Sequence, residues 1–273
     1  MRTLLLIASL AVVAFAPSAS ANSERVRIDY VEPRNQTQLP ILKRLKENRV
    51  LETLQDILGA FRLPRPLLLQ TKDCDGVSNA WYENDTVTMC YELVAEIVVR
   101  APLKPTQAGI TREDAIVGTL VQMLLHESGH ALFELLDVPI FGREEDAADQ
   151  FAAYLIMQMQ TEDARRIIDG VTLMLWNRSQ EQKLDRDTFS NVHGLAAQRF
   201  FNLVCMAYGR HPFLYADLVS KGVLPQERSE SCKAEYGQVA EAFDKLISPH
   251  IDPDARGKFK TTLRRFRVPA KLQ

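Results

Sequence analysis

The sequence lacks the residues and motifs on which several common protein classes depend. Its 273 residues hold 33 Lys and Arg against 35 Asp and Glu, so it has no basic excess of the kind that a nucleic-acid binder carries. No GxSxG, GxxxxGK[ST] or GxGxxG stretch is present, which leaves serine-hydrolase, P-loop and dinucleotide-binding chemistry without their usual motifs. It also has no internal repeat, low-complexity segment or His-rich tract, which argues against repeat architectures and metal storage.

Long apolar runs are equally scarce, and the one that exists lies at the N-terminus. Arg2 is followed by an apolar stretch over residues 4–15 and by Ala19-Ser20-Ala21, a small-x-small cleavage pattern. We therefore predict a signal peptide over residues 1–21, and a mature chain without a membrane span that is periplasmic or secreted. A retained N-terminal anchor is the alternative. Removing Arg2 with the leader lowers the basic count from 33 to 32, for a net charge near −3.

Only four cysteines are present, and none stands in a CxxC or CxH pattern that would indicate a metal site. An even number of cysteines behind an export signal predicts two disulfides in an oxidising compartment. Three pairings are possible. We predict the local one, Cys74–Cys90 and Cys205–Cys232, because each pair flanks one compact stretch.

Apolar periodicity predicts a mainly helical α+β protein with a single domain over residues 22–273. Short strands are expected at 66–71, 79–82 and 86–91. Helical spacing dominates from residue 111 onward. We therefore expect a small N-terminal lobe with the strands over residues 22–110. A helical C-terminal lobe that carries the metal site is expected over residues 111–273.

The segments outside these elements have weaker signals. Residues 22–38 are polar and are predicted to be irregular, whereas residues 41–61 have apolar residues at the spacing of one helix. The C-terminal tail is locally basic and is predicted to be a solvated, partly frayed end rather than a binding arm.

Two histidines and a glutamate interrupt an apolar stretch, LLHESGHALFELL, at residues 124–136. The stretch belongs to a predicted helix that begins after an N-cap at Thr111, so His126 and His130 lie one turn apart on one face. Two imidazoles at this spacing can bind one metal ion, and Glu127, about 100° further round the helix, can reach a water molecule without being a ligand. This HExxH arrangement of zinc peptidases predicts Glu127 as a general base.

A catalytic zinc ion needs a third protein ligand and an open position. The next predicted helix begins with the acidic run EEDAAD, and a break at residues 137–143 would fold it back beside His130. We assign Glu145 as the third ligand. Asp149, one turn further on, is predicted to accept a hydrogen bond from a ligating histidine and so to fix its tautomer.

HESGH followed by Glu145-x-x-x-Asp149 resembles the gluzincin metallopeptidases, typified by thermolysin and neprilysin, and the resemblance implies a zincin-like fold. Asn79-Ala80-Trp81-Tyr82 resembles the edge strand that pairs with the substrate backbone in those enzymes, which implies substrate binding by Asn79 and Ala80. His193 and Arg199, six residues apart, resemble neprilysin's histidine that stabilises the transition state and arginine that binds a substrate carbonyl.

Most of the mature chain resembles a bacterial family assigned to metallopeptidases by motif, domain-of-unknown-function family 4344. The resemblance is carried by NAWY…CYEL, HESGH, EEDAAD, QRFFNLVCMAYG and LPQERSESC. It implies an exported hydrolase with one Zn²⁺ per chain that acts on a peptide or protein substrate.

The sequence leaves alternatives open. The whole protein could be a catalytically inactive binding or scaffold protein on a peptidase fold, with a structural metal or none. The alternatives for single residues are Glu144, Asp146 or Asp149 as the third ligand, a structural hydrogen bond for His193, an ion pair with an acid for Arg199, and a turn position for Asn79.

Overall fold

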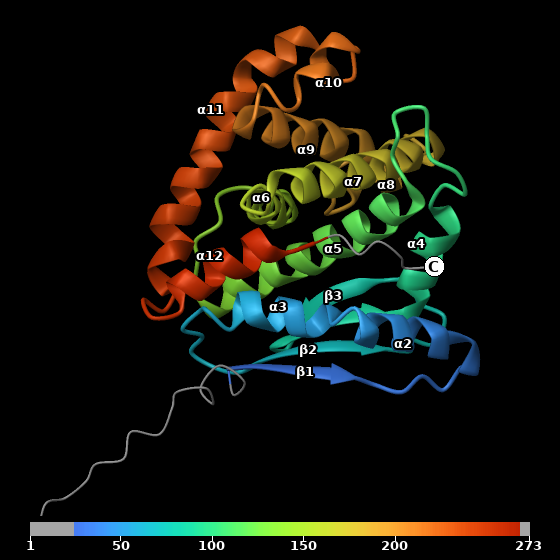
Figure 1. The fold of residues 1–273 in the computed structure, drawn as a ribbon, viewed down its shortest axis with the longest axis vertical. Helices are drawn as coiled ribbons and strands as arrows, with labels where there is room; N and C mark the ends of the chain where they lie inside the picture. The colour runs from blue at the N-terminus through green and yellow to red at the C-terminus, as the bar shows by residue number, and fades with distance from the viewer. Residues whose placement is uncertain (1–24, 268–273) are drawn as a thin grey trace, which may run out of the picture.

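The computed structural model describes residues 25–267, in which a small sheet packs against a larger group of helices (Figure 1). The chain is therefore an α+β protein dominated by helices, as predicted. The signal peptide predicted over residues 1–21 lies outside the described residues. Between residues 25 and 267, no helix has the length and apolar character needed to cross a membrane.

The sheet has four strands in the order β1-β2-β4-β3. β1 (Val26–Tyr30), β2 (Leu67–Lys72) and β4 (Thr86–Cys90) are parallel neighbours, and β3 (Ala80–Glu83) pairs with β4 in the antiparallel direction. Every second residue of β2 is buried, as expected for a sheet with one face on the core. Among the described residues β3 pairs on one side alone, so it leaves a free backbone edge.

Helix α5 (Arg112–Leu135) runs through the middle of the molecule (Figure 1). It contacts β3 and β4 on one side and the helical half on the other. Thr111 and Asp114 form a capping box at its first turn, which confirms the predicted N-cap. The other helices on the sheet side are α2 (Leu39–Glu47), α3 (Val50–Leu58) and α4 (Tyr91–Arg100). The remaining helices are α6 (Glu144–Ile156), α7 (Thr161–Glu181), α8 (Arg186–Ser190), α9 (Ala196–Arg210), α10 (Ala216–Ser220), α11 (Gln226–Ala242) and α12 (Arg256–Arg265).

Two predictions about the N-terminal part were wrong. Residues 22–38 are not irregular throughout, because VRIDY forms β1 and buries Val26 completely beside β2. Residues 41–61 are not one helix. Arg49 adopts a left-handed conformation with φ 51°, which separates α2 from α3, and the apolar spacing continues across this break and so conceals it.

The prediction of a frayed C-terminal end was also wrong for the residues that the structure describes. Residues 256–265 form α12, which packs against α3. Phe259 and Leu263 are buried on its inner face, and Phe259 meets the ring of Phe61 edge to face. The basic residues occupy the exposed side of the helix, so the basic composition of the tail concealed a narrow apolar stripe.

Helices α5 and α7 pack so closely that a glycine is needed between them. A Cβ atom on Gly170 would lie 1.9 Å from the backbone oxygen of Asp114. We expect Gly170→Ala to lower the free energy of unfolding by roughly 2–4 kcal/mol, because backbone atoms must move apart. The matched control is Gly237→Ala in α11, where an added Cβ would meet no atom within 4 Å and should be neutral or stabilising. Urea denaturation of both variants measures the difference, and equal midpoints would contradict the packing argument.

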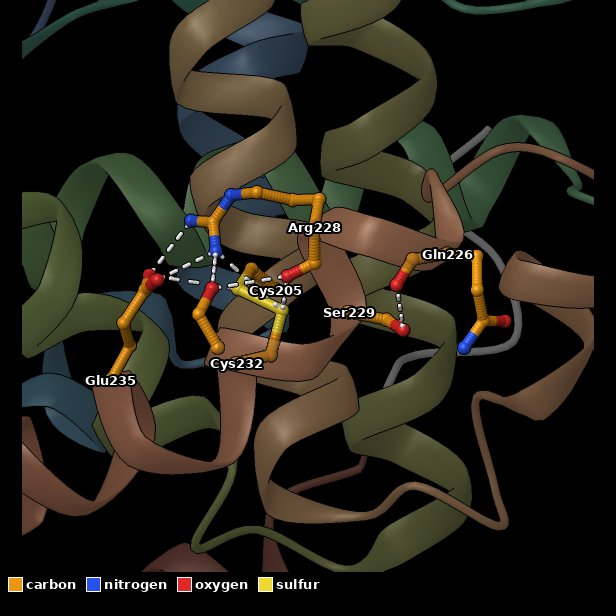
Figure 2. The surroundings of a disulfide bond; sticks show 7 residues. Cys205, Gln226, Arg228, Ser229, Cys232 and Glu235 are labelled. Carbon is orange, nitrogen blue, oxygen red and sulfur yellow. Dashed lines mark hydrogen bonds and ion pairs between the residues drawn. A yellow bond between two sulfur atoms is a disulfide. The ribbon is translucent and has the colours of Figure 1, made fainter.

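The structure contains the two disulfides of the predicted local pairing, Cys74–Cys90 and Cys205–Cys232. The second joins α9 to α11, and both of its cysteines are completely buried. Figure 2 shows Arg228 beside this disulfide, with its guanidinium paired to Glu235 about two turns further along α11. The Cys205–Cys232 disulfide therefore holds α9 and α11 together.

Candidate metal centre

His126 and His130 project side by side from the C-terminal half of α5, as their spacing predicts. Their Nε2 atoms are 3.2 Å apart, and His126 is buried. Gly129, between them, lets α6 approach: a Cβ atom there would lie 3.2 Å from the Phe151 ring and 3.4 Å from the Cα atom of Ala148. The first turn of α6 therefore reaches the two imidazoles.

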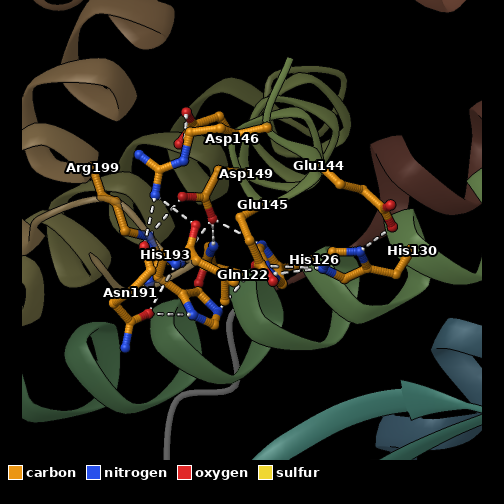
Figure 3. A network of polar contacts seen from close by, with 12 residues as sticks. Gln122, His126, His130, Glu144, Glu145, Asp146, Asp149, Asn191, His193 and Arg199 are labelled. Atoms are coloured by element: carbon orange, nitrogen blue, oxygen red, sulfur yellow. Dashed lines mark hydrogen bonds and ion pairs between the residues drawn. The ribbon is translucent and has the colours of Figure 1, made fainter. Parts of the chain in front are cut away.

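A tight turn after α5 brings the acidic start of α6 over the histidines. Asp137 with φ 52° and Gly142 with φ 118° reverse the chain within this turn. Glu145 Oε2 then lies 3.1 Å from His126 Nε2 and 3.5 Å from His130 Nε2 (Figure 3). The ligand atoms of these three residues all lie within 4.8 Å of one another.

The second nitrogen of each of the two histidines faces a carboxylate. Asp149 Oδ1 lies 2.9 Å from His126 Nδ1, and Glu144 Oε1 lies 2.7 Å from His130 Nδ1 (Figure 3). An ionised carboxylate accepts only, so we assign the proton of each imidazole to Nδ1. In the neutral form of each imidazole, Nε2 then directs a lone pair toward Glu145.

Three acceptor atoms thus meet at separations of 3.1, 3.2 and 3.5 Å. They repel one another unless a cation or a proton lies among them. Zinc in tetrahedral geometry, with bonds of about 2.0–2.2 Å, holds its ligand atoms roughly 3.4 Å apart. The donor set and its spacing therefore fit a small divalent cation.

The charges of the network agree with this interpretation. Burial lowers the pKa of His126, but hydrogen bonds with Asp149 and Glu145 outweigh burial and raise it to about 9. The hydrogen bond with His126 lowers the pKa of Glu145 to about 2. In the metal-free chain His126 therefore holds an extra proton beside Glu145, and a metal ion that binds between these residues displaces that proton.

Asp149 is held by partners on two other helices. Burial raises its pKa, but hydrogen bonds from His126 and Arg199 outweigh burial and hold the pKa below its ordinary value. Arg199 Nε donates to Asp149 Oδ2 at 2.7 Å and Arg199 Nη2 donates to Oδ1 at 2.8 Å, while Gln122 Nε2 donates to Oδ1 at 2.9 Å. These hydrogen bonds hold the Asp149 carboxylate against Nδ1 of His126 and away from the candidate metal position between the two Nε2 atoms.

Glu127 lies beside the three candidate metal-ligand atoms, His126 Nε2, His130 Nε2 and Glu145 Oε2, but does not contribute one of them. Its side chain lines the same cleft but is only 9% exposed, and burial raises its pKa. A carboxylate with a raised pKa binds a proton more readily, which suits a group that accepts a proton from water.

The cleft beside the three donor atoms has a volume of about 1050 Å³, and the free edge of the sheet forms one wall. Cys90 N–H donates to the carbonyl of Asn79, so Asn79 and Trp81 direct their backbone groups toward β4. Because these directions alternate along an antiparallel strand, Ala80 and Tyr82 direct theirs outward. Asn79 and Ala80 thus line the cleft at an edge that an extended peptide can join.

His193 reaches the site from the segment before α9. Its Nε2 atom lies 3.0 Å from Glu145 Oε2, and its backbone N–H donates to Asn191 Oδ1 at 2.9 Å. Burial lowers the pKa of His193, although the charge of Glu145 acts in the opposite direction. Arg143 Nη2 donates to the carbonyl of Val192 at 2.5 Å, which ties this segment to the start of α6. The structure thus brings His193 and Arg199 to one cleft with the HExxH residues.

A family model described as "Putative metallopeptidase", domain-of-unknown-function family 4344, matches residues 30–247. The chain belongs to this family. The matched range includes the edge strand, α5, α6 and the segment from His193 to Arg199. A search of curated proteins and a search of solved structures each found no match.

Sequence reasoning missed several residues around the centre of this metallopeptidase-family chain. Gln122 lies one turn before His126 on the same face, so helical spacing could have identified it. Asn191 two residues before His193 is an Asx-turn pattern. Glu144 was considered only as a rival ligand, and Arg143 bonds backbone carbonyls, a role with no sequence signal.

Proposed function

We propose that the chain is an exported, zinc-dependent peptidase with a zincin-like active site. The observation that carries the proposal is the meeting of His126 Nε2, His130 Nε2 and Glu145 Oε2 at tetrahedral spacing beside the buried carboxylate of Glu127. The family match supports the same reaction class. The two disulfides fit an oxidising compartment.

His126, His130 and Glu145 would hold the ion. When bound, zinc supplies Lewis acidity, which polarises a peptide carbonyl and makes a water molecule more acidic. Two imidazoles with one carboxylate are a usual zinc donor set. Asp149 and Glu144 keep both imidazoles in the tautomer that presents Nε2.

Glu127 accepts the proton of the attacking water and then donates it to the leaving amine. Its burial and raised pKa suit both steps. His193 Nε2 lies 3.0 Å from Glu145 Oε2, close enough to the three candidate ligand atoms to donate to the oxyanion that develops on the carbonyl. Arg199 Nε and Nη2 each donate one hydrogen bond to Asp149, so a substrate carbonyl would accept from the N–H groups that remain on Nη1 and Nη2.

The substrate is proposed to be an extended peptide. The outward backbone groups of Ala80 and the outward carbonyl of Tyr82 would pair with it as an added strand, while the Tyr82 N–H faces Glu127. The Asn79 side chain would bond one of the peptide's amides. This arrangement binds main chain, so it supports peptide hydrolysis over the cleavage of a small non-peptide substrate.

Metal content of the purified mature protein tests the proposal. We expect about one zinc ion per wild-type chain and none after His126→Ala, together with cleavage in a peptide library by the wild type alone. A chain that binds no zinc after reloading and dialysis would overturn the proposal. Zinc that stabilises the wild type without any hydrolysis would instead indicate a binding protein.

A further inference from the structure

A single residue holds both ends of the loop that leads into the candidate substrate-binding strand. The sulfur of Cys90 is bonded to Cys74, where the loop begins. The backbone N–H of Cys90 donates to the carbonyl of Asn79 at 3.1 Å, where the loop ends. Cys90 is itself completely buried as the last residue of β4, so it is a rigid anchor for both attachments.

The other attachments of the loop are non-covalent and lie near the surface. Residues 75–79 are all exposed, so burial of apolar surface does not determine their conformation. Glu92 accepts from the backbone N–H groups of Cys74 and Gly76 at 3.1 and 3.0 Å, and Ser78 Oγ donates to Glu96. Within the loop, Val77 N–H donates to the carbonyl of Cys74 at 3.1 Å, and the exposed Asp75 pairs with Arg34. These bonds are solvent-accessible and individually weak, so the covalent attachment is the main restraint.

We infer that the Cys74–Cys90 disulfide is a positioning device for substrate: it holds Asn79 and the start of β3 at the wall of the cleft. The inference rests on the proposed function. The device acts on peptide binding alone, because His126, His130 and Glu145 come from α5 and α6, which the disulfide does not join.

The second disulfide provides a matched control within the same chain. Cys205 and Cys232 are also joined across a short separation, but they connect α9 to α11 and do not line the cleft. Loss of either disulfide should lower stability. Only loss of Cys74–Cys90 should also weaken peptide binding.

The test compares Cys74→Ser/Cys90→Ser with Cys205→Ser/Cys232→Ser. Serine at position 90 keeps the N–H that bonds Asn79 and suits the N-cap of α4. For the first variant we expect unchanged zinc content, KM for fluorescein-labelled casein raised on the order of tenfold, and faster hydrogen exchange confined to residues 75–83. The second variant should have a lower Tm and the wild-type KM.

Reduction of the wild type gives an independent measurement if the double variant does not fold. A water-soluble phosphine cleaves the partly exposed Cys74–Cys90 bond before the buried one: the phosphine becomes its oxide, water supplies the oxygen, and both sulfurs become thiols. The KM should rise and then return after reoxidation by oxidised glutathione, with zinc retained throughout.

An unchanged KM after loss of Cys74–Cys90, or an equal rise in both double variants, would overturn the inference. If the wild type hydrolyses nothing, the proposed function fails separately, and the affinity of each zinc-loaded protein for labelled casein becomes the readout. Weaker binding in the Cys74/Cys90 variant alone would then support the positioning device, and equal binding in all three proteins would refute it.

Discussion

Glu127→Gln is expected to lower kcat by about 10³-fold or more while the protein keeps its zinc. Glutamine has the shape of glutamate but cannot accept the proton of an attacking water. Glu127 does not belong to the group of three donor atoms, so the substitution leaves the ligand set intact. It also removes a carboxylate whose pKa burial raises, and the melting temperature should therefore be unchanged or slightly higher.

Three measurements on purified protein check this expectation: kcat on a cleaved peptide, zinc per chain by elemental analysis, and melting temperature. Glu134→Gln is the matched control, since Glu134 lies two turns further along α5, borders the same cleft and bonds Arg65. It should keep its kcat. Substantial hydrolysis by the Glu127→Gln protein would contradict a general-base role for Glu127.

The second large effect is expected from the two carboxylates of α6, and it separates a ligand from an orienting group. Glu145→Ala should leave no tightly bound zinc after dialysis, because one of the three donor atoms is lost. Asp149→Ala should weaken zinc binding by about 10- to 100-fold, because Asp149 orients His126 without ligating. Competitive titration with a chelator of known affinity measures both.

Stability has to be measured alongside affinity for these variants. Removing Asp149 leaves the largely buried Arg199 without its carboxylate, and an uncompensated buried charge costs roughly 3–5 kcal/mol. Asp149→Asn is the milder control, since its amide oxygen can still accept from His126 or Arg199. The reverse ranking, with zinc lost in the folded Asp149 variants and kept in Glu145→Ala, would make Asp149 the ligand.

The parts of the fold that followed from the sequence are those with a local physical cause. The helix over α5 follows from its apolar face and its Thr111–Asp114 capping box. The strands around residues 80–90 follow from β-formers on both sides of a short turn. The first strand and the last helix did not follow, because Val26 and Phe259 become core residues only through partners far away in the chain.

The candidate site divides in the same way. By itself, the sequence determined that His126 and His130 share one helix face and that Glu127 lies beside them, because the helical repeat sets these relations. Only the tertiary structure decided which acidic residue faces which nitrogen. Glu145 meets both Nε2 atoms while Glu144 and Asp149 meet the Nδ1 atoms. That outcome depends on the turn through Asp137 and Gly142 and on the close approach at Gly129, which no helical repeat encodes.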